Sequence, residues 1–191
     1  MRQTTIAELQ DWLEQDEAVS RSHRAERLSK LLAVLPDEEM VFFGGLASAQ
    51  AYIEIRLAYI HGLYLSTVLL ALACIEQELA GALHTRGMDS AAHARLENLL
   101  KESLTTGIIT SVEFKTFNRL REVRNSYTHF RPPTHRTAWA RRAMATDVPV
   151  DDILEADAVG ALSALGSFID RSASMTVTVQ TPTGTATDKA G

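Results

Sequence analysis

Cysteine and long apolar runs are scarce in this 191-residue sequence, and each scarcity excludes some classes of protein. The single cysteine, Cys74, cannot form an internal disulfide. Its apolar neighbours Ala73 and Ile75 predict a small buried side chain and not a nucleophile. The N-terminus lacks the basic residues, apolar stretch and small-residue cleavage site of a secretion signal. We therefore expect a cytoplasmic protein.

The longest apolar run has only 13 residues, from Leu63 to Ile75, and it contains Ser66 and Thr67. A helix needs about 20 apolar residues to cross a bilayer. The run therefore predicts a buried core helix, and we expect no membrane partner.

Motifs for metals, phosphates and nucleophiles are also missing. The six histidines show no His-Glu-x-x-His or similar spacing, and Gly44-Gly45 lacks the rest of a phosphate-binding loop. No stretch resembles a Ser-His-Asp signature. The sequence therefore predicts neither a metal site nor a cofactor.

The dominant pattern in the sequence is that of helices: apolar residues recur every three or four positions in each long segment. Thr5 to Glu8 has the spacing of a capping box, at the start of one or two helices that end at Pro36. The later helices are expected at about 46–61, 63–85, 92–104, from 111 to the Pro132-Pro133 pair, and from 151 or 152 to about 169. This pattern predicts an all-α protein, an up-down bundle of four to five helices with N- and C-terminal helical additions.

The helix pattern predicts that the chain has three parts. Residues 1–45 form an N-terminal helical extension, 46–172 form the bundle domain, and 173–191 form a largely disordered C-terminal tail. Within the tail, Met175 to Gln180 alternates like a strand but has no partner strand. The final residues, from Thr181, are polar and small and carry no apolar pattern.

Charge is unevenly distributed along the chain. The formal net charge is −5, yet residues 115–142 contain eight basic residues and one acid, Glu122, for a local charge of +7. Such a basic segment on an acidic protein predicts a local anion site. The alternative is internal pairing with the acidic N-terminal helix, which carries Glu8, Asp11, Glu14, Asp16 and Glu17.

The candidate catalytic residues of the sequence lie at 124–129, which read Arg-Asn-Ser-Tyr-Thr-His. At 100° per residue, a polar stripe faces away from the apolar side chains of the same helix. The stripe consists of Arg121, Arg124, Asn125, Thr128 and His129; the apolar side consists of Leu120, Val123, Tyr127 and Phe130. A solvated face without function is the alternative interpretation.

The order of these parts resembles a HEPN domain over roughly residues 46–132. The resemblance rests on an apolar helix that ends in Glu76-Gln-Glu78, the helix Leu96-Glu-Asn-Leu-Leu, the turn Gly107-Ile-Ile, and an Arg with a His five residues later. HEPN domains are helical bundles that commonly dimerise. Many are metal-independent ribonucleases in toxin–antitoxin or defence systems, with a site composed across the dimer.

The resemblance implies roles for individual residues. Arg124 and His129 would be the motif pair, Asn125 the adjoining polar residue, and Glu76 or Glu78 an acidic partner. The RNA-binding residues would be Arg121, Arg131, His135 and Arg136. The branch of toxins controlled by a nucleotidyltransferase antitoxin carries a Tyr where this chain has Arg131, so that control is not expected here.

The chemistry can also be argued from the residues. RNA cleaves when its 2′-hydroxyl attacks the adjacent phosphorus, which requires only proton transfer and charge stabilisation. His129 suits the first task and Arg124 the second. Residues five apart on a helix lie about 140° apart, so the two converge poorly within one chain. We therefore expect a homodimer. Two alternatives remain open: a catalytically silent HEPN-like dimer that binds a partner protein or small ligand, and a structural helical subunit.

Overall fold

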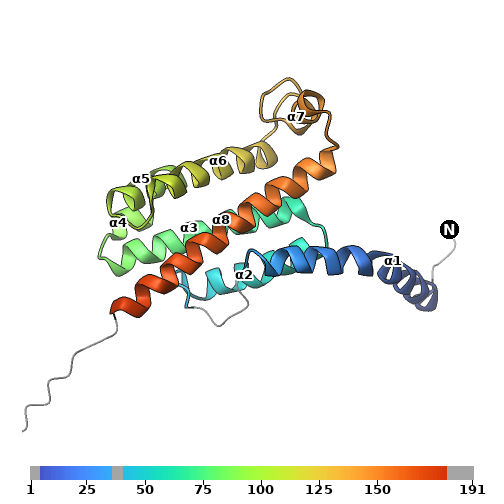
Figure 1. Cartoon of the computed structure of the whole chain (residues 1–191), viewed down its shortest axis with the longest axis horizontal. Coiled ribbons are helices and arrows are strands. Elements are labelled where there is room, and N and C mark those ends of the chain that lie inside the picture. The colour runs from blue at the N-terminus through green and yellow to red at the C-terminus, as the bar shows by residue number, and fades with distance from the viewer. Residues whose placement is uncertain (1–4, 36–40, 180–191) are drawn as a thin grey trace, which may run out of the picture.

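The computed structural model describes residues 5–35 and 41–179, and the side chains of 173–179 are not among the details described. These residues form eight α-helices and no strand, which confirms the all-α class (Figure 1). The helices are α1 (Ile6–Leu32), α2 (Gly45–Ile60), α3 (Tyr64–Thr85), α4 (Asp89–Ala92), α5 (Leu96–Thr105), α6 (Ser111–Thr128), α7 (Trp139–Thr146) and α8 (Val150–Val179).

Helix α3 is the centre of the bundle. It packs against α2, α4, α5, α6 and α8, and it contains the apolar run that predicts a core helix. Its buried residues are Thr67, Val68, Ala71, Leu72, Cys74, Ile75, Glu78, Leu79 and Leu83. It is also the one described helix that is long and apolar enough to cross a membrane by length and composition. A core helix passes the same test, and burial against five neighbours is what a core helix requires.

Helix α1 is continuous over 27 residues, which settles whether the N-terminal segment forms one helix or two. It starts at the expected capping box, in which Thr5 accepts from the Glu8 N–H and Glu8 accepts from the Thr5 N–H. Only its second half packs on the bundle. There Arg27 Nε donates to the Ile60 carbonyl at 2.8 Å, and Leu31 is buried.

Two glycines allow backbone segments to approach the bundle closely. A Cβ added at Gly81 would lie 2.1 Å from the Phe43 carbonyl oxygen, and one at Gly166 would lie 1.9 Å from that of Val34. The loop before α2 is therefore packed tightly against α3, and the turn that follows α1 is packed tightly against α8. Both positions exclude any side chain larger than hydrogen.

Two expectations for the second half of the chain are wrong. Residues 175–179, which alternate like a strand, lie inside α8, which continues to Val179, and Gln180 lies outside the described residues. A strand without a partner leaves its backbone groups unpaired, whereas a helix pairs them locally. Helix α5 begins at Leu96 and not at residue 92, because the short α4 takes residues 89–92 and ends before it. The tail predicted from Thr181 lies outside the described residues.

A pair of glycine variants in α8 tests the close approach at Gly166. Gly166→Ala should lower the free energy of unfolding by about 1–3 kcal/mol, because the methyl group collides with the Val34 carbonyl. Gly160→Ala should instead raise it by about 0.5–1 kcal/mol, because that helical position is open and alanine favours helix. Urea unfolding measures both. Equal effects of the two substitutions would contradict the close approach of the turn after α1 to α8.

Candidate functional site

The polar stripe lies on α6, whose start and buried face follow from its sequence. Thr110 and Glu113 form a capping box, so the helix begins at Ser111. Phe117 and Leu120 are buried against the bundle, as the apolar spacing predicts. The stripe residues Arg121, Arg124 and Asn125 are half-buried, and Thr128 and His129 are exposed.

His129 does not belong to the helix, which corrects the expectation that α6 extends to the prolines. The last helical residue is Thr128, and His129 has an extended backbone with φ −124° and ψ 137°. Residues before a proline avoid helical angles, and the segment that leads into Pro132-Pro133 has already left the helix. The angle of about 140° between Arg124 and His129, which assumed a continuous helix, therefore does not apply.

Arg124 points toward α3 and meets Glu76. Its Nη1 lies 3.8 Å from Glu76 Oε2, and its Nη2 donates to Asn125 Oδ1 at 3.3 Å. The structure thus brings together Arg124, Asn125 and one of the two acids singled out in the sequence. Both side chains of the ion pair are half-buried, so the guanidinium is oriented but still reaches solvent.

Glu78, the other acid, has a different environment. It is 3% exposed, and its carboxylate accepts backbone N–H groups from Phe43 at 3.0 Å and Gly44 at 2.9 Å. A buried carboxylate with two such donors is satisfied in place. Glu78 therefore holds the loop before α2 and does not contribute to the Arg124 cluster.

His129 lines a different pocket, between the end of α6 and the start of α7. The pocket has a volume of about 340 Å³, and its walls include Tyr127, Phe130, Arg131 and Trp139. Arg124 is not part of its lining. Within one chain, the two motif residues therefore face different neighbours.

A carboxylate from α8 fixes the wall of this pocket. Asp157 accepts two hydrogen bonds from Arg142, at 2.6 and 2.7 Å, and a third from the Tyr127 hydroxyl. Burial and the hydrogen bond to Asp157 raise the pKa of Tyr127 well above its usual range, so the hydroxyl remains a donor. Trp139 packs edge-on against the Tyr127 ring, with centroids 5.8 Å apart.

The expected RNA-binding residues lie at the surface near this end of α6. Arg121 pairs with Glu97 at 3.3 Å, and Arg136, which is 79% exposed, pairs with Glu122 at 3.6 Å. Arg131 is exposed as well. The exposed pair of Arg136 and Glu122 contributes little to stability, which leaves Arg136 available to anions, whereas Arg121 is half-buried.

His135 is held differently from these arginines. Its Nδ1 accepts the Thr137 N–H at 3.3 Å. The imidazole is therefore tied to its own loop through one nitrogen, and only Nε2 is left to reach a ligand.

Internal neutralisation by the N-terminal helix is not found among the described residues. In those residues the ion pairs of the basic segment go to Glu76, Glu97, Glu122 and Asp157. Glu17 of α1 pairs with Arg24 of the same helix. The acidic N-terminal helix and the basic segment are thus separate surfaces of one chain.

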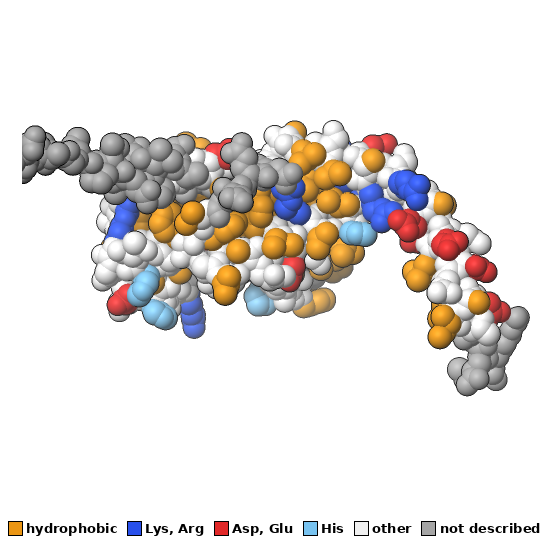
Figure 2. All heavy atoms as spheres, turned by 90° about the horizontal axis from the view of Figure 1, so that it is seen from below, with side chains coloured by type: hydrophobic (Ala, Val, Ile, Leu, Met, Phe, Trp, Pro, Cys, Tyr) orange, Lys and Arg blue, Asp and Glu red, His pale blue; other side chains and the backbone are white. Residues whose placement is uncertain are grey.

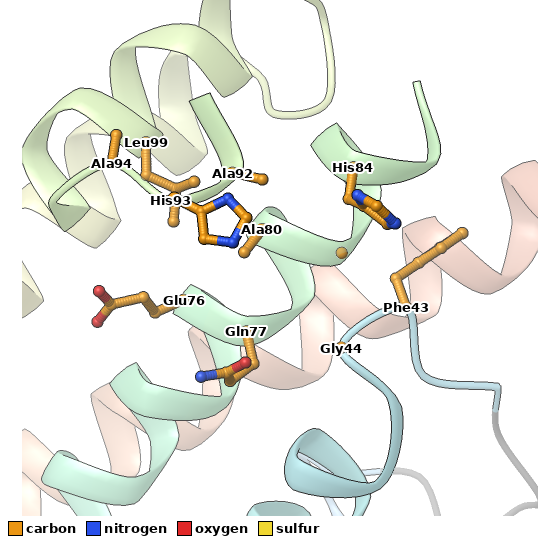
Figure 3. A pocket seen from close by; sticks show the side chains of 11 residues that line it. Phe43, Gly44, Glu76, Gln77, Ala80, His84, Ala92, His93, Ala94 and Leu99 are labelled. Atoms are coloured by element: carbon orange, nitrogen blue, oxygen red, sulfur yellow. The ribbon is translucent and has the colours of Figure 1, made fainter. Parts of the chain in front are cut away.

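A second pocket lies next to the Arg124–Glu76 pair, with Glu76 in its lining (Figure 3). No pattern in the sequence predicts it. It has a volume of about 480 Å³, and Glu76, Gln77, His84 and His93 lie on its wall. Asp89 contacts both histidines. Its carboxylate oxygen lies 2.5 Å from His84 Nδ1, and its backbone carbonyl oxygen lies 2.8 Å from His93 Nδ1.

The carbonyl partner fixes the tautomer of His93. A carbonyl only accepts, so His93 Nδ1 carries the hydrogen and Nε2 of the neutral ring is left as an acceptor. The spacing of His84, Asp89 and His93 matches no metal or catalytic signature, so only the fold reveals this pocket. Among the described residues, no group of three or more His, Cys, Asp or Glu side chains is arranged to hold a metal ion.

No protein-family model, curated protein or solved structure matches this chain. The chemistry of the two pockets therefore has to be argued from their residues.

Two tyrosines test the hydrogen bond that fixes the pocket wall. Tyr127→Phe should lower the free energy of unfolding by about 1–3 kcal/mol, because Asp157 loses a donor. Tyr59→Phe is the matched control: its hydroxyl is buried without a hydrogen-bond partner, so its removal should be neutral or stabilising. Thermal unfolding at neutral pH compares the two. A Tyr127→Phe protein as stable as wild type would show that the Asp157 contact is dispensable.

Proposed function

We propose that the protein is a metal-independent endoribonuclease of the HEPN type, with a site completed by a second copy of the chain. The observation that carries the proposal is the Arg124 guanidinium, held by Glu76 and Asn125 at the surface of the +7 segment. An oriented guanidinium in a basic surface is suited to a phosphodiester. His129 lies one residue beyond the same helix, with its side chain exposed.

The reaction that these groups support is transesterification of RNA. One imidazole takes the proton of the 2′-hydroxyl, the 2′-oxygen forms a bond to phosphorus, and the bond from phosphorus to the 5′-oxygen breaks. The leaving 5′-oxygen takes a proton from a second imidazole, and the other product carries a 2′,3′-cyclic phosphate. Arg124 stabilises the negative charge on the phosphorane oxygens.

The second copy is required by the directions of the side chains. In one chain Arg124 is turned toward α3, whereas His129 lines the pocket beside α7. In the proposed dimer, a two-fold axis perpendicular to α6, between Arg124 and His129, brings each Arg124 near the His129 of the partner and supplies the two imidazoles that the reaction uses. A homodimer with α6 at its seam is therefore part of the proposal, and a toxin or defence role follows from the resemblance.

The second candidate function is a non-catalytic dimer that binds a partner protein or small ligand. The separation of Arg124 from His129 within one chain favours it, as does the pocket lined by His84 and His93. This candidate keeps the same dimer but requires no cleavage. Activity measurements separate the two candidates.

Cleavage of structured and single-stranded RNAs in EDTA tests the ribonuclease. We expect cutting to persist without metal and to leave 2′,3′-cyclic or 3′-phosphate ends. His129→Ala should lower the rate by about a hundred- to ten-thousand-fold, because proton transfer is lost. Arg124→Ala should do the same through lost charge stabilisation.

Two further variants serve as controls. His23→Ala removes an exposed histidine on α1 and should cut at the wild-type rate. Arg136→Ala should weaken RNA binding and reduce its salt dependence, while bound RNA is still cut. Cutting that requires a metal, or full activity of His129→Ala, would favour the non-catalytic dimer.

A further inference from the structure

The first half of α1, residues 6–19, is an arm that lies outside the bundle. Every residue from Thr5 to Val19 is exposed, and 14 helical residues extend about 21 Å. Figures 1 and 2 show α1 extending away from the remaining helices. Its second half is fixed to the bundle through Arg27 and Leu31 within one continuous helix, so the arm cannot fold back onto its own chain.

Four large apolar side chains form a stripe along the arm. Ile6, Leu9, Trp12 and Leu13 lie within about 120° of one another around the helix, and they are between 49% and 76% exposed. A helix of this length gains its stability from the burial of such a face. Burial of the stripe therefore requires a partner surface.

The remainder of the arm is acidic. It has five acids and no basic residue. Asp11 and Glu14 lie on the side away from the stripe, Glu8 lies at its edge, and Asp16 and Glu17 follow the stripe at its C-terminal end. A matching surface must be apolar at its centre and basic around it.

The end of the bundle around α7 has these two properties. Phe130 is 91% exposed and Trp139 is 38% exposed, and both line the pocket that contains His129. Arg131 lies on the same pocket, and the exposed Arg136 and Arg141 follow in the +7 segment. Exposed aromatic residues with arginines around them are typical of the centre of a protein interface.

We propose that the arm docks on the pocket beside α7 of a second copy of this chain, and that the two copies exchange arms. The second copy is the occupant because the chain carries both halves of the match: an apolar stripe with five acids, and an exposed aromatic pair in a segment of charge +7. Reciprocal exchange is a closed two-fold arrangement. It also uses each arm and each pocket, which doubles the area that one arm would bury. The contact does not depend on RNA cleavage.

Site-directed crosslinking between two full-length variants tests the contact. The only native cysteine, Cys74, is buried and its pKa is raised to about 12 by that burial, so it does not react. An affinity-tagged Asp16→Cys protein, altered in line with the stripe, is mixed with an untagged Ala140→Cys protein, altered at an exposed position of the pocket lining, and treated with a short bismaleimide. We expect a tagged–untagged heterodimer as the main product.

Matched variants define the register of the contact. Ala7→Cys lies on the opposite side of the arm, and Asn98→Cys lies on α5, at the other end of the bundle from α7 (Figure 1). When either control variant takes the place of the corresponding test variant in the mixture, we expect little crosslinking. Trp12→Glu in the Asp16→Cys protein should lower the yield about tenfold or more, because one large side chain is no longer buried. Leu13→Ala removes a smaller apolar side chain from the stripe, so we expect it to lower the crosslinking yield by less.

Any other pattern overturns the proposal. Equal yields from Asp16→Cys and Ala7→Cys, which lie on opposite sides of the helix, would mean collision without a defined contact. Coupling of Asp16→Cys to itself would place the arms against each other, and no coupling at all would remove the second copy as occupant. Because no RNA is present, loss of ribonuclease activity and loss of the arm contact are measured separately.

Discussion

A single carboxylate, Asp157, determines the geometry at the end of the bundle where the proposed functions meet. It accepts from Arg142 of α7 and Tyr127 of α6, and it lies on α8. Removal of either donor leaves a half-buried charge underpaired, which is costly in such surroundings. The carboxylate thereby sets the direction in which the chain leaves α6, the position of Trp139 on Tyr127 and the shape of the pocket that contains His129.

The core helix α3 governs the other half of the site. Glu76 and Glu78 are two residues apart, which is about 200° around a helix, so they face opposite sides. Glu78 is turned inward and holds the loop at Phe43 and Gly44, whereas Glu76 reaches Arg124 at the surface. Arg124 is therefore oriented by the central helix of the bundle, and the buried glutamate has a structural task.

Local patterns in the sequence predicted most of the fold. Three–four spacing located α2, α3 and α6, and the capping boxes at Thr5 and Thr110 located two helix starts. The errors arose where the outcome depends on distant parts of the chain. The alternation after Met175 suggests a strand only if a partner strand exists. The role of Asp157 and the pocket that His93 shares with Glu76 both depend on residues far apart in the sequence.

Both proposals depend on a second copy of the chain, and both place it at the α6–α7 end. The acidic arm and RNA are anionic, so a basic surface that accepts either would make them compete. Sedimentation equilibrium of the unmodified protein at micromolar concentration tests the shared requirement most directly. The account predicts the mass of a homodimer. A strictly monomeric mass would contradict both the composite site and the exchange of arms.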